Sequence, residues 1–204
     1  MTSRVLALFR CLISQKYQAA RHAAHTVSFV REQQTTMPRR HQYLVDLEWT
    51  GNRGDGTRHY TAYERDFVAR VSGKPSLEGS ADPAFRGDAG RWNPEDMLVA
   101  SVSACHKLWY LHLCAEAGIR VMTYHDRAEG TMQEGAPAAD DKTQTESQSE
   151  AGRFTSIVLR PEITLAAGDD IALAHELHHR AHALCFIANS LNFPVSCEAV
   201  ITHQ

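Results

Sequence analysis

Residues 93–118 read NPEDMLVASVSACHKLWYLHLCAEAG and predict the long helix around which the rest of the chain is organised. Asn93 can cap this helix, Pro94 suits its first position, and the two carboxylates that follow favour its positive end. Apolar side chains then recur at spacings of three and four and form one stripe: Leu98, Val102, Cys105, Trp109 and Leu113. Gly118 is a natural stop. The stretch therefore predicts a helix with a cysteine in the middle of its apolar face.

Segments on both sides of this helix have the patterns of strands and of a second helix. Residues 41–50 alternate apolar and polar side chains, which predicts a half-buried strand. The other expected elements are strands over 57–71, 120–132 and 154–166, a polar loop over 133–152, a helix over 170–191 and a last strand over 194–203. The order of these strands and helices predicts an α+β fold with antiparallel sheets and two central helices.

The first 36 residues differ in composition from the rest of the chain. Five basic side chains stand against a single acid, Glu32. We interpret residues 1–36 as an N-terminal extension, which is either a leader or a set of codons upstream of a true start at Met37. The second alternative is favoured because a strand pattern begins at residue 41. Residues 37–204 then form one domain.

Composition restricts the classes of partner. The chain of 204 residues is 43% hydrophobic and has a formal net charge of −3, so it lacks the basic excess that nucleic acids attract. No apolar run approaches the roughly 18 residues that span a bilayer, so no membrane partner is expected. The five cysteines, at positions 11, 105, 114, 185 and 197, are odd in number and form no CxxC pair, which is typical of free thiols in a reducing cytoplasm. Two of them, Cys114 and Cys197, are interpreted as structural.

Cys105 and Cys185 lie on the two predicted helices, where each taken alone reads as an inert core thiol. A reactive thiol needs a neighbouring cation, because burial alone raises a thiol pKa. Cys105 lies about 15 Å along the axis from its helix start, which is too far for the helix dipole to help. Arg86, in the loop before the helix, is the candidate cation, and Glu95 could hold its guanidinium in a bidentate pair. The alternative is a solvated arginine and a helix-start carboxylate without a role.

The residues around the two cysteines form two motif blocks. The first consists of FRGD at 85–88, NPEDML at 93–98 and SACH at 103–106, and the second is AHALC at 181–185. Together these blocks resemble those of the OsmC/Ohr family, the osmotically inducible and organic hydroperoxide resistance proteins. The order of the predicted elements over residues 41–203 is similar as well.

The resemblance implies an OsmC-like fold, an intertwined homodimer, and an oxidoreductase of the oxidative stress response that reduces organic hydroperoxides to alcohols. Cys105 would be the peroxidatic cysteine, and its sulfenic acid would be resolved by Cys185 as an intramolecular disulfide. A dithiol, in some family members a lipoyl group, would reduce that disulfide. The resemblance implies no cofactor and no metal.

The resemblance leaves the activating cation open between two arginines, Arg86 with Glu95 or Arg53 in the glycine-rich turn. We prefer Arg86. Because Glu95 lies about 15 Å along the helix axis from Cys105, an Arg86–Glu95 pair is expected to serve the Cys105 of a second chain.

Two other classes of function compete with this interpretation. His175-Glu176-Leu177-His178-His179 satisfies HExxH, the signature of zinc hydrolases. His175 and His179 lie nearly opposite the apolar stripe of their helix, however, so a solvated face is favoured over a zinc site. The other alternative is a non-catalytic small-molecule binding protein that keeps the fold. Counting free thiols before and after one equivalent of an alkyl hydroperoxide separates the peroxidase from the binding protein, and zinc in the purified protein would indicate the hydrolase.

Overall fold

The computed structural model describes residues 39–135 and 152–204. The boundary expected at Met37 and most of the loop expected over 133–152 lie outside these described residues. Residues Leu44–Gln204 form one compact unit, which carries every element discussed below. Within the described ranges, no helix is both long and apolar enough to cross a membrane.

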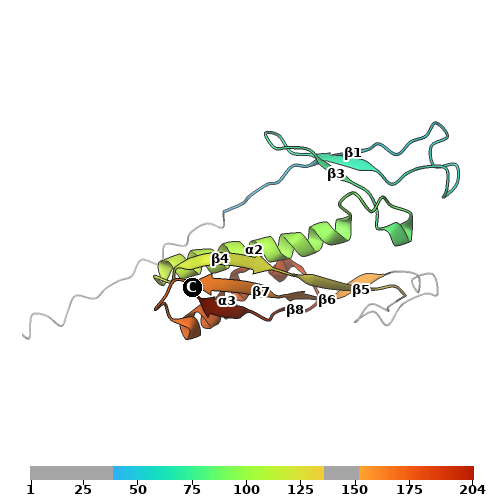
Figure 1. The fold of residues 1–204 in the computed structure, drawn as a ribbon. Coiled ribbons are helices and arrows are strands. Elements are labelled where there is room, and N and C mark those ends of the chain that lie inside the picture. The colour runs from blue at the N-terminus through green and yellow to red at the C-terminus, as the bar shows by residue number, and fades with distance from the viewer. Residues whose placement is uncertain (1–38, 136–151) are drawn as a thin grey trace, which may run out of the picture. The chain divides into compact units, whose positions relative to one another are not determined.

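An antiparallel meander in the order β1-β2-β3 forms the first sheet (Figure 1). Its strands are β1 (Asp46–Trp49), β2 (Phe67–Arg70) and β3 (Leu77–Gly79), so the first two are shorter than expected and the third was not singled out. The chain between β1 and β2 is held by local bonds instead, because the side chain of Asn52 accepts two backbone N–H groups of the glycine-rich turn, at 2.9 and 3.1 Å.

The prediction of a half-buried first strand is wrong for the single chain. All four residues of β1 are exposed, and Leu47 is 61% exposed. Within the described residues, no strand of this sheet pairs with any later strand. The apolar alternation of β1 is therefore present in the sequence but is not covered by this chain.

Helix α2 (Pro94–Glu116) confirms the predicted long helix. The side chain of Asn93 accepts the backbone N–H of Asp96 at 2.7 Å. Gly118 follows the helix with φ +75°, a left-handed conformation that glycine adopts without steric cost. The buried side chains of α2 are Val102, His106, Tyr110, Leu113 and Cys114. The buried face is thus rotated by about one residue from the predicted stripe, and Cys105 lies at its edge, partly exposed.

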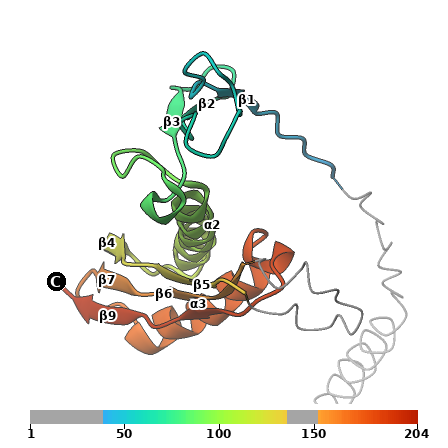
Figure 2. The ribbon, with the colours of Figure 1, turned by 90° about the vertical axis from the view of Figure 1, so that its right-hand side faces the viewer.

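The strands that follow α2 act as two halves of one bent, three-stranded sheet. Each of three chain segments supplies one strand to each half: β4 (Val121–Asp126) and β5 (Glu129–Gln133), β6 (Arg153–Leu159) and β7 (Pro161–Leu165), and β8 (Val195–Cys197) and β9 (Val200–His203). One half has the order β4-β7-β9 (Figure 2), and the other has the order β5-β6-β8. Backbone bonds continue across the bend, for example from the N–H of Glu198 to the carbonyl of Leu159 at 2.8 Å.

The expected antiparallel pairing is present, and two further strand pairs are parallel. The pairs β4–β7 and β5–β6 are antiparallel, whereas β6–β8 and β7–β9 are parallel. The reason is the second helix, which lies between β7 and β8 in the chain. A helical crossover returns the chain in its original direction, so the strands that follow pair in parallel.

Helix α3 (Ile171–Leu184) ends before the predicted end at residue 191. Asp170 caps its start by accepting a first-turn backbone N–H at 3.0 Å. At the other end, the side chain of Asn189 donates to a last-turn carbonyl at 3.0 Å, and a short 3-10 turn (Ala188–Ser190) follows. A side chain thus takes the place of the next helical bond, and Cys185 becomes the first residue beyond α3.

Two apolar clusters fill the interior, and α2 and α3 pack directly on each other. The larger joins both helices to β7 and β9 and includes Tyr110, Leu113, Ile163, Leu165, Leu177 and Ala181. The smaller is centred on Val102, Ile157 and Leu159. Along α2, His106 lies between Val102 of one cluster and Tyr110 of the other.

Candidate active site

The structure brings the two predicted cysteines together. Cys105 lies halfway along α2 and is partly exposed, whereas Cys185 directly follows α3 and is fully buried. Cys105 acts on the Cys185 thiol and helps to raise its pKa, so the two side chains are neighbours, and both are free thiols. The sequence placed the cysteines on separate elements, and their contact arises from the packing of α2 on α3.

The surroundings of Cys185 keep its proton on the sulfur. Burial raises the pKa of the Cys185 thiol to about 11, and the neighbouring Cys105 contributes to the rise. The backbone N–H of Ala188 donates to the Cys185 sulfur at 3.5 Å and opposes this shift. At neutral pH Cys185 is therefore a protonated thiol.

Apolar side chains border the thiol pair on the exposed side. The rings of Trp109 on α2 and Phe186 meet edge to face, with centroids 5.7 Å apart. Phe186 is 70% exposed and Leu108 is 63% exposed, although both are large and apolar. An apolar molecule approaching Cys105 would find a matching surface here.

Arg86 is exposed in the loop before α2 and follows the 3-10 turn η1 (Pro83–Phe85). Its φ of 65° makes it the one non-glycine residue with a left-handed backbone in the described part of the chain. Within that part it enters no ion pair. The loop passes close to the backbone of Ala81 at Gly87, where any side chain would collide with the Ala81 carbonyl.

Glu95 lines an open groove of about 950 Å³ that runs beside α2 and is also bordered by β4, β5 and β6. Its Oε2 atom is buried and has no partner within the described residues, and the same is true of the Tyr124 hydroxyl. Neither Arg86 nor Cys105 lines this groove. Within the described residues, Arg86 and Glu95 form no ion pair, and neither side chain is placed next to Cys105.

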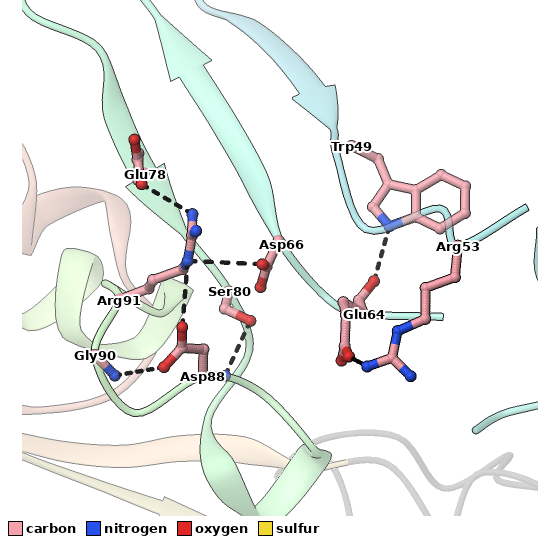
Figure 3. A network of polar contacts seen from close by, with 9 residues as sticks. All are labelled: Trp49, Arg53, Glu64, Asp66, Glu78, Ser80, Asp88, Gly90 and Arg91. Carbon is pink, nitrogen blue, oxygen red and sulfur yellow. Dashed lines mark hydrogen bonds and ion pairs between the residues drawn. The ribbon is translucent and has the colours of Figure 1, made fainter. Parts of the chain in front are cut away.

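Two other arginines of this region, Arg53 and Arg91, form ion pairs (Figure 3). Arg53, the alternative cation, forms an ion pair with Glu64. Arg91 contacts three carboxylates, those of Asp66, Glu78 and Asp88, at 3.6, 3.1 and 3.3 Å. These pairs tie the first sheet to the loop before α2 and leave Arg86 as the arginine of that loop without a described ion pair.

A second polar cluster lies beside the thiol pair, and the sequence did not single it out. His106 Nε2 lies 2.9 Å from His178 Nδ1, and both histidines are buried. The sulfur of Cys197 lies 3.6 Å from the same His178 nitrogen. Burial lowers the pKa of His106 to about 4 and that of His178 to about 3. Helical spacing could have predicted that His106 is buried, since His106 lies four residues from both Val102 and Tyr110 on the same helix.

The HExxH residues point elsewhere. His175, Glu176 and His179 are all exposed, as the apolar stripe of this helix predicts. The buried histidine is His178, one of the two unspecified positions of the motif. Within the described residues, His175, Glu176 and His179 do not come together as a group of metal ligands, as a zinc hydrolase would require.

The chain is thus a small α+β protein with two packed helices and a pair of neighbouring thiols where these helices meet. The family model for OsmC-like proteins matches residues 87–199, and the chain belongs to this family.

Comparison with individual proteins agrees with this assignment. The chain is 23% identical over 168 residues to the uncharacterized protein YmaD of Bacillus subtilis (strain 168), covering 79% of this chain and 95% of that protein. An OsmC-like protein of unknown function from Vibrio cholerae matches with a TM-score of 0.66 at 24% identity, covering 79% of this chain and all of the other. An organic hydroperoxide resistance protein from Legionella pneumophila matches with a TM-score of 0.55 at 15% identity, covering 81% and 99%. These likenesses confirm the OsmC-like fold.

Proposed function

We propose that the protein is a thiol peroxidase that reduces organic hydroperoxides to alcohols. The observation that carries the proposal is the contact between the partly exposed Cys105 and the buried Cys185. The family supports it, since solved relatives from Legionella pneumophila and Elizabethkingia anophelis are named organic hydroperoxide resistance proteins.

In the first step the Cys105 thiolate attacks the outer oxygen of the hydroperoxide. The O–O bond breaks, the sulfur becomes a sulfenic acid, and the alkoxide takes a proton and leaves as an alcohol. Cys105 has this role because it is the more exposed of the two sulfurs. The apolar surface of Trp109, Phe186 and Leu108 suits the organic part of the substrate.

In the second step Cys185 resolves the sulfenic acid. Its sulfur bonds to that of Cys105, and its proton leaves with the hydroxyl as water. Cys185 is held next to Cys105 as a thiol, so both the sulfur and the proton are in place. An external dithiol then reduces the disulfide and is itself oxidised.

Activation of Cys105 belongs to a homodimer in this proposal. Arg86 is exposed without a described ion pair, and Glu95 has a buried oxygen without a described partner. Glu95 lies in the first turn of α2, about 15 Å along the axis from Cys105, and Arg86 lies in the loop before that turn. A second chain, with its α2 antiparallel to the first, would bring Arg86 to the other Cys105. The exposed apolar side chains of β1 are the surface on which two chains would pair.

The test is consumption of an alkyl hydroperoxide with a dithiol reductant. Cys105→Ser should abolish consumption, and Cys185→Ser should allow one turnover that ends in a trappable sulfenic acid. Cys114→Ser is the matched control, since Cys114 is a free thiol on the same helix α2 but is not in contact with the pair. Full steady-state activity of Cys105→Ser would refute the proposed function.

A small-molecule binding protein is the second candidate, and the groove beside α2 is the observation in its favour. Two of its lining residues, Glu95 and Tyr124, carry buried polar atoms without described partners. The functions are separated by counting free thiols after one equivalent of an alkyl hydroperoxide. Loss of two thiols per chain supports the peroxidase, and no loss supports the binding protein.

A further inference from the structure

Three metal-binding side chains from three different elements converge beneath the bend of the sheet. His106 comes from α2, His178 from α3, and Cys197 from the end of β8. One nitrogen of each imidazole and the sulfur of Cys197 all lie within 4.8 Å of one another. His106 is 1% exposed and His178 is 5% exposed, whereas Cys197 is partly buried, so two of the three side chains lie inside the protein.

Two of the three distances between these atoms are close to those of a tetrahedral zinc site. With bonds of about 2.05 Å to nitrogen and 2.3 Å to sulfur, tetrahedral angles place two nitrogens about 3.4 Å apart and a nitrogen and a sulfur about 3.6 Å apart. The Cys197 sulfur and His178 Nδ1 are 3.6 Å apart. The two nitrogens, at 2.9 Å, would need to separate by about half an ångström.

The protonation states also suit a cation. Burial keeps both imidazoles neutral at pH 7, and neutral imidazole is the form that binds metals. Without a cation, the two facing nitrogens share one N–H proton between them. Burial raises the pKa of the Cys197 thiol to about 12, so a bound divalent cation would have to release that proton to solvent.

The surroundings hold the cluster in position and balance its charge. The ring of Tyr110 stacks on that of His178, with centroids 3.9 Å apart and planes 12° apart. The carboxylate of Asp126 acts electrostatically on both His106 and Cys197. A divalent cation with one thiolate ligand carries a net charge of +1, which a neighbouring carboxylate offsets.

We propose that His106, His178 and Cys197 form a binding site for a divalent cation of the zinc type. The ligand set of two imidazoles and one thiolate favours Zn²⁺ over the oxygen-seeking Mg²⁺ and Ca²⁺. The site joins α2, α3 and β8 at the level between the two apolar clusters. It is separate from the Cys105–Cys185 pair and does not depend on peroxidase activity.

The test uses the full chain, reduced and stripped of metal, titrated with Co²⁺ as a spectroscopic substitute for Zn²⁺. One Co²⁺ per chain should bind and give both the visible bands of a tetrahedral site and a sulfur-to-cobalt charge-transfer band. Cys197→Ser should remove the charge-transfer band, and His178→Gln should weaken binding by at least about tenfold.

Two variants serve as matched controls for this titration. Cys114→Ser removes another buried thiol, and His175→Ala removes an exposed neighbour of His178 on the same helix. Both should keep the full cobalt spectrum. The proposal is overturned if wild-type protein gives no such spectrum, if Cys197→Ser keeps the charge-transfer band, or if either control loses it.

A measurement on the wild-type chain covers the case in which a variant does not fold. Alkylation of each cysteine is followed by peptide mass spectrometry with Zn²⁺ or Mg²⁺ added. Zn²⁺ should slow alkylation of Cys197 by at least about tenfold, and Mg²⁺ should have no effect. An unchanged rate at Cys197 in the presence of Zn²⁺ would rule the site out.

Discussion

The hydroxyl of Ser103 donates to the carboxylate of Asp126 at 2.5 Å, and this bond ties helix α2 to the bend of the sheet. The other oxygen of Asp126 accepts the backbone N–H of Arg160 at 2.8 Å. One carboxylate thus joins α2 to two neighbouring segments of the bent sheet, next to the cysteine and histidine clusters.

Loss of this bond should weaken the fold. We expect Ser103→Ala to lower the free energy of unfolding by about 1.5–3 kcal/mol, the usual range for a hydrogen bond to a charged group. Urea denaturation followed by circular dichroism measures the change. Ser101→Ala is the matched control, because the Ser101 hydroxyl bonds only to a carbonyl of its own helix turn. Equal stability of both variants would show that the Ser103–Asp126 bond contributes nothing.

Stability in acid should depend on Asp169, which precedes α3. Side-chain hydrogen bonds from Arg120 lower the pKa of the Asp169 carboxyl, with a smaller contribution from His203. A folded-state pKa below the unfolded value stabilises the protein above about pH 4, and this stabilisation is lost as the pH falls through the lowered pKa. Asp169→Asn should therefore be less stable than wild type at pH 7, with a difference that narrows below about pH 4.

The measurement for Asp169 is the free energy of unfolding at a series of pH values. Glu176→Gln is the control, since Glu176 is an exposed carboxylate on α3 that forms no described ion pair. That variant should follow the wild-type curve. A constant difference between Asp169→Asn and wild type at all pH values would contradict the prediction.

The apolar border of the thiol pair should select organic substrates. Phe186→Ala removes the ring that meets Trp109, which should cost about 1 kcal/mol of binding, or roughly fivefold in kcat/KM, for a large alkyl hydroperoxide. The value for hydrogen peroxide should change little. Leu173→Ala, at the far end of α3, is the control for loss of an exposed apolar side chain. A uniform fall for both substrates would assign Phe186 a structural role only.

The two-chain site predicts complementation between inactive variants. Arg86→Ala and Cys105→Ser should each be inactive, but a heterodimer of the two carries one site with both residues intact. After full exchange of equal amounts, about a quarter of all sites are intact, so about a quarter of wild-type activity should return. Native mass spectrometry verifies the exchange.

Two controls test whether the restored activity comes from a site shared between two chains. Mixing Cys105→Ser with Cys185→Ser should restore nothing, because the two thiols interact within one chain. Arg53→Ala should keep most activity, because Arg53 is paired with Glu64. If exchange is complete and Arg86→Ala with Cys105→Ser stays inactive, Arg86 acts within its own chain or has no part in the reaction.

Features set by neighbouring residues were predictable from the sequence, and those set by distant contacts were not. The start of α2 was predictable because Asn93 caps its own helix, and its end because Gly118 stops it. The family assignment followed from local motifs in the same way. The bend of the sheet could not be predicted, because each strand is interrupted by bonds to a different segment, such as that from Arg160 to Asp126.

The residues of the candidate site were likewise predictable where local motifs define them and not where distant contacts do. Cys105 and Cys185 were found through their motifs, but the end of α3 at Cys185 depends on the Asn189 side chain. The His106–His178 pair was missed because HExxH draws attention to the exposed histidines beside His178. Which histidine is buried depends on where α2 and α3 touch, and a one-residue rotation of the apparent stripe was enough to hide His106.

At Arg86 the backbone conformation favours glycine, whereas the proposed reaction needs the arginine side chain. Its φ of 65° is a conformation that glycine adopts freely and that costs other residues on the order of 1 kcal/mol. Arg86→Gly should therefore relax the loop while it removes the guanidinium. At this residue, a change that makes the protein more stable is also the change that deprives the proposed reaction of its cation.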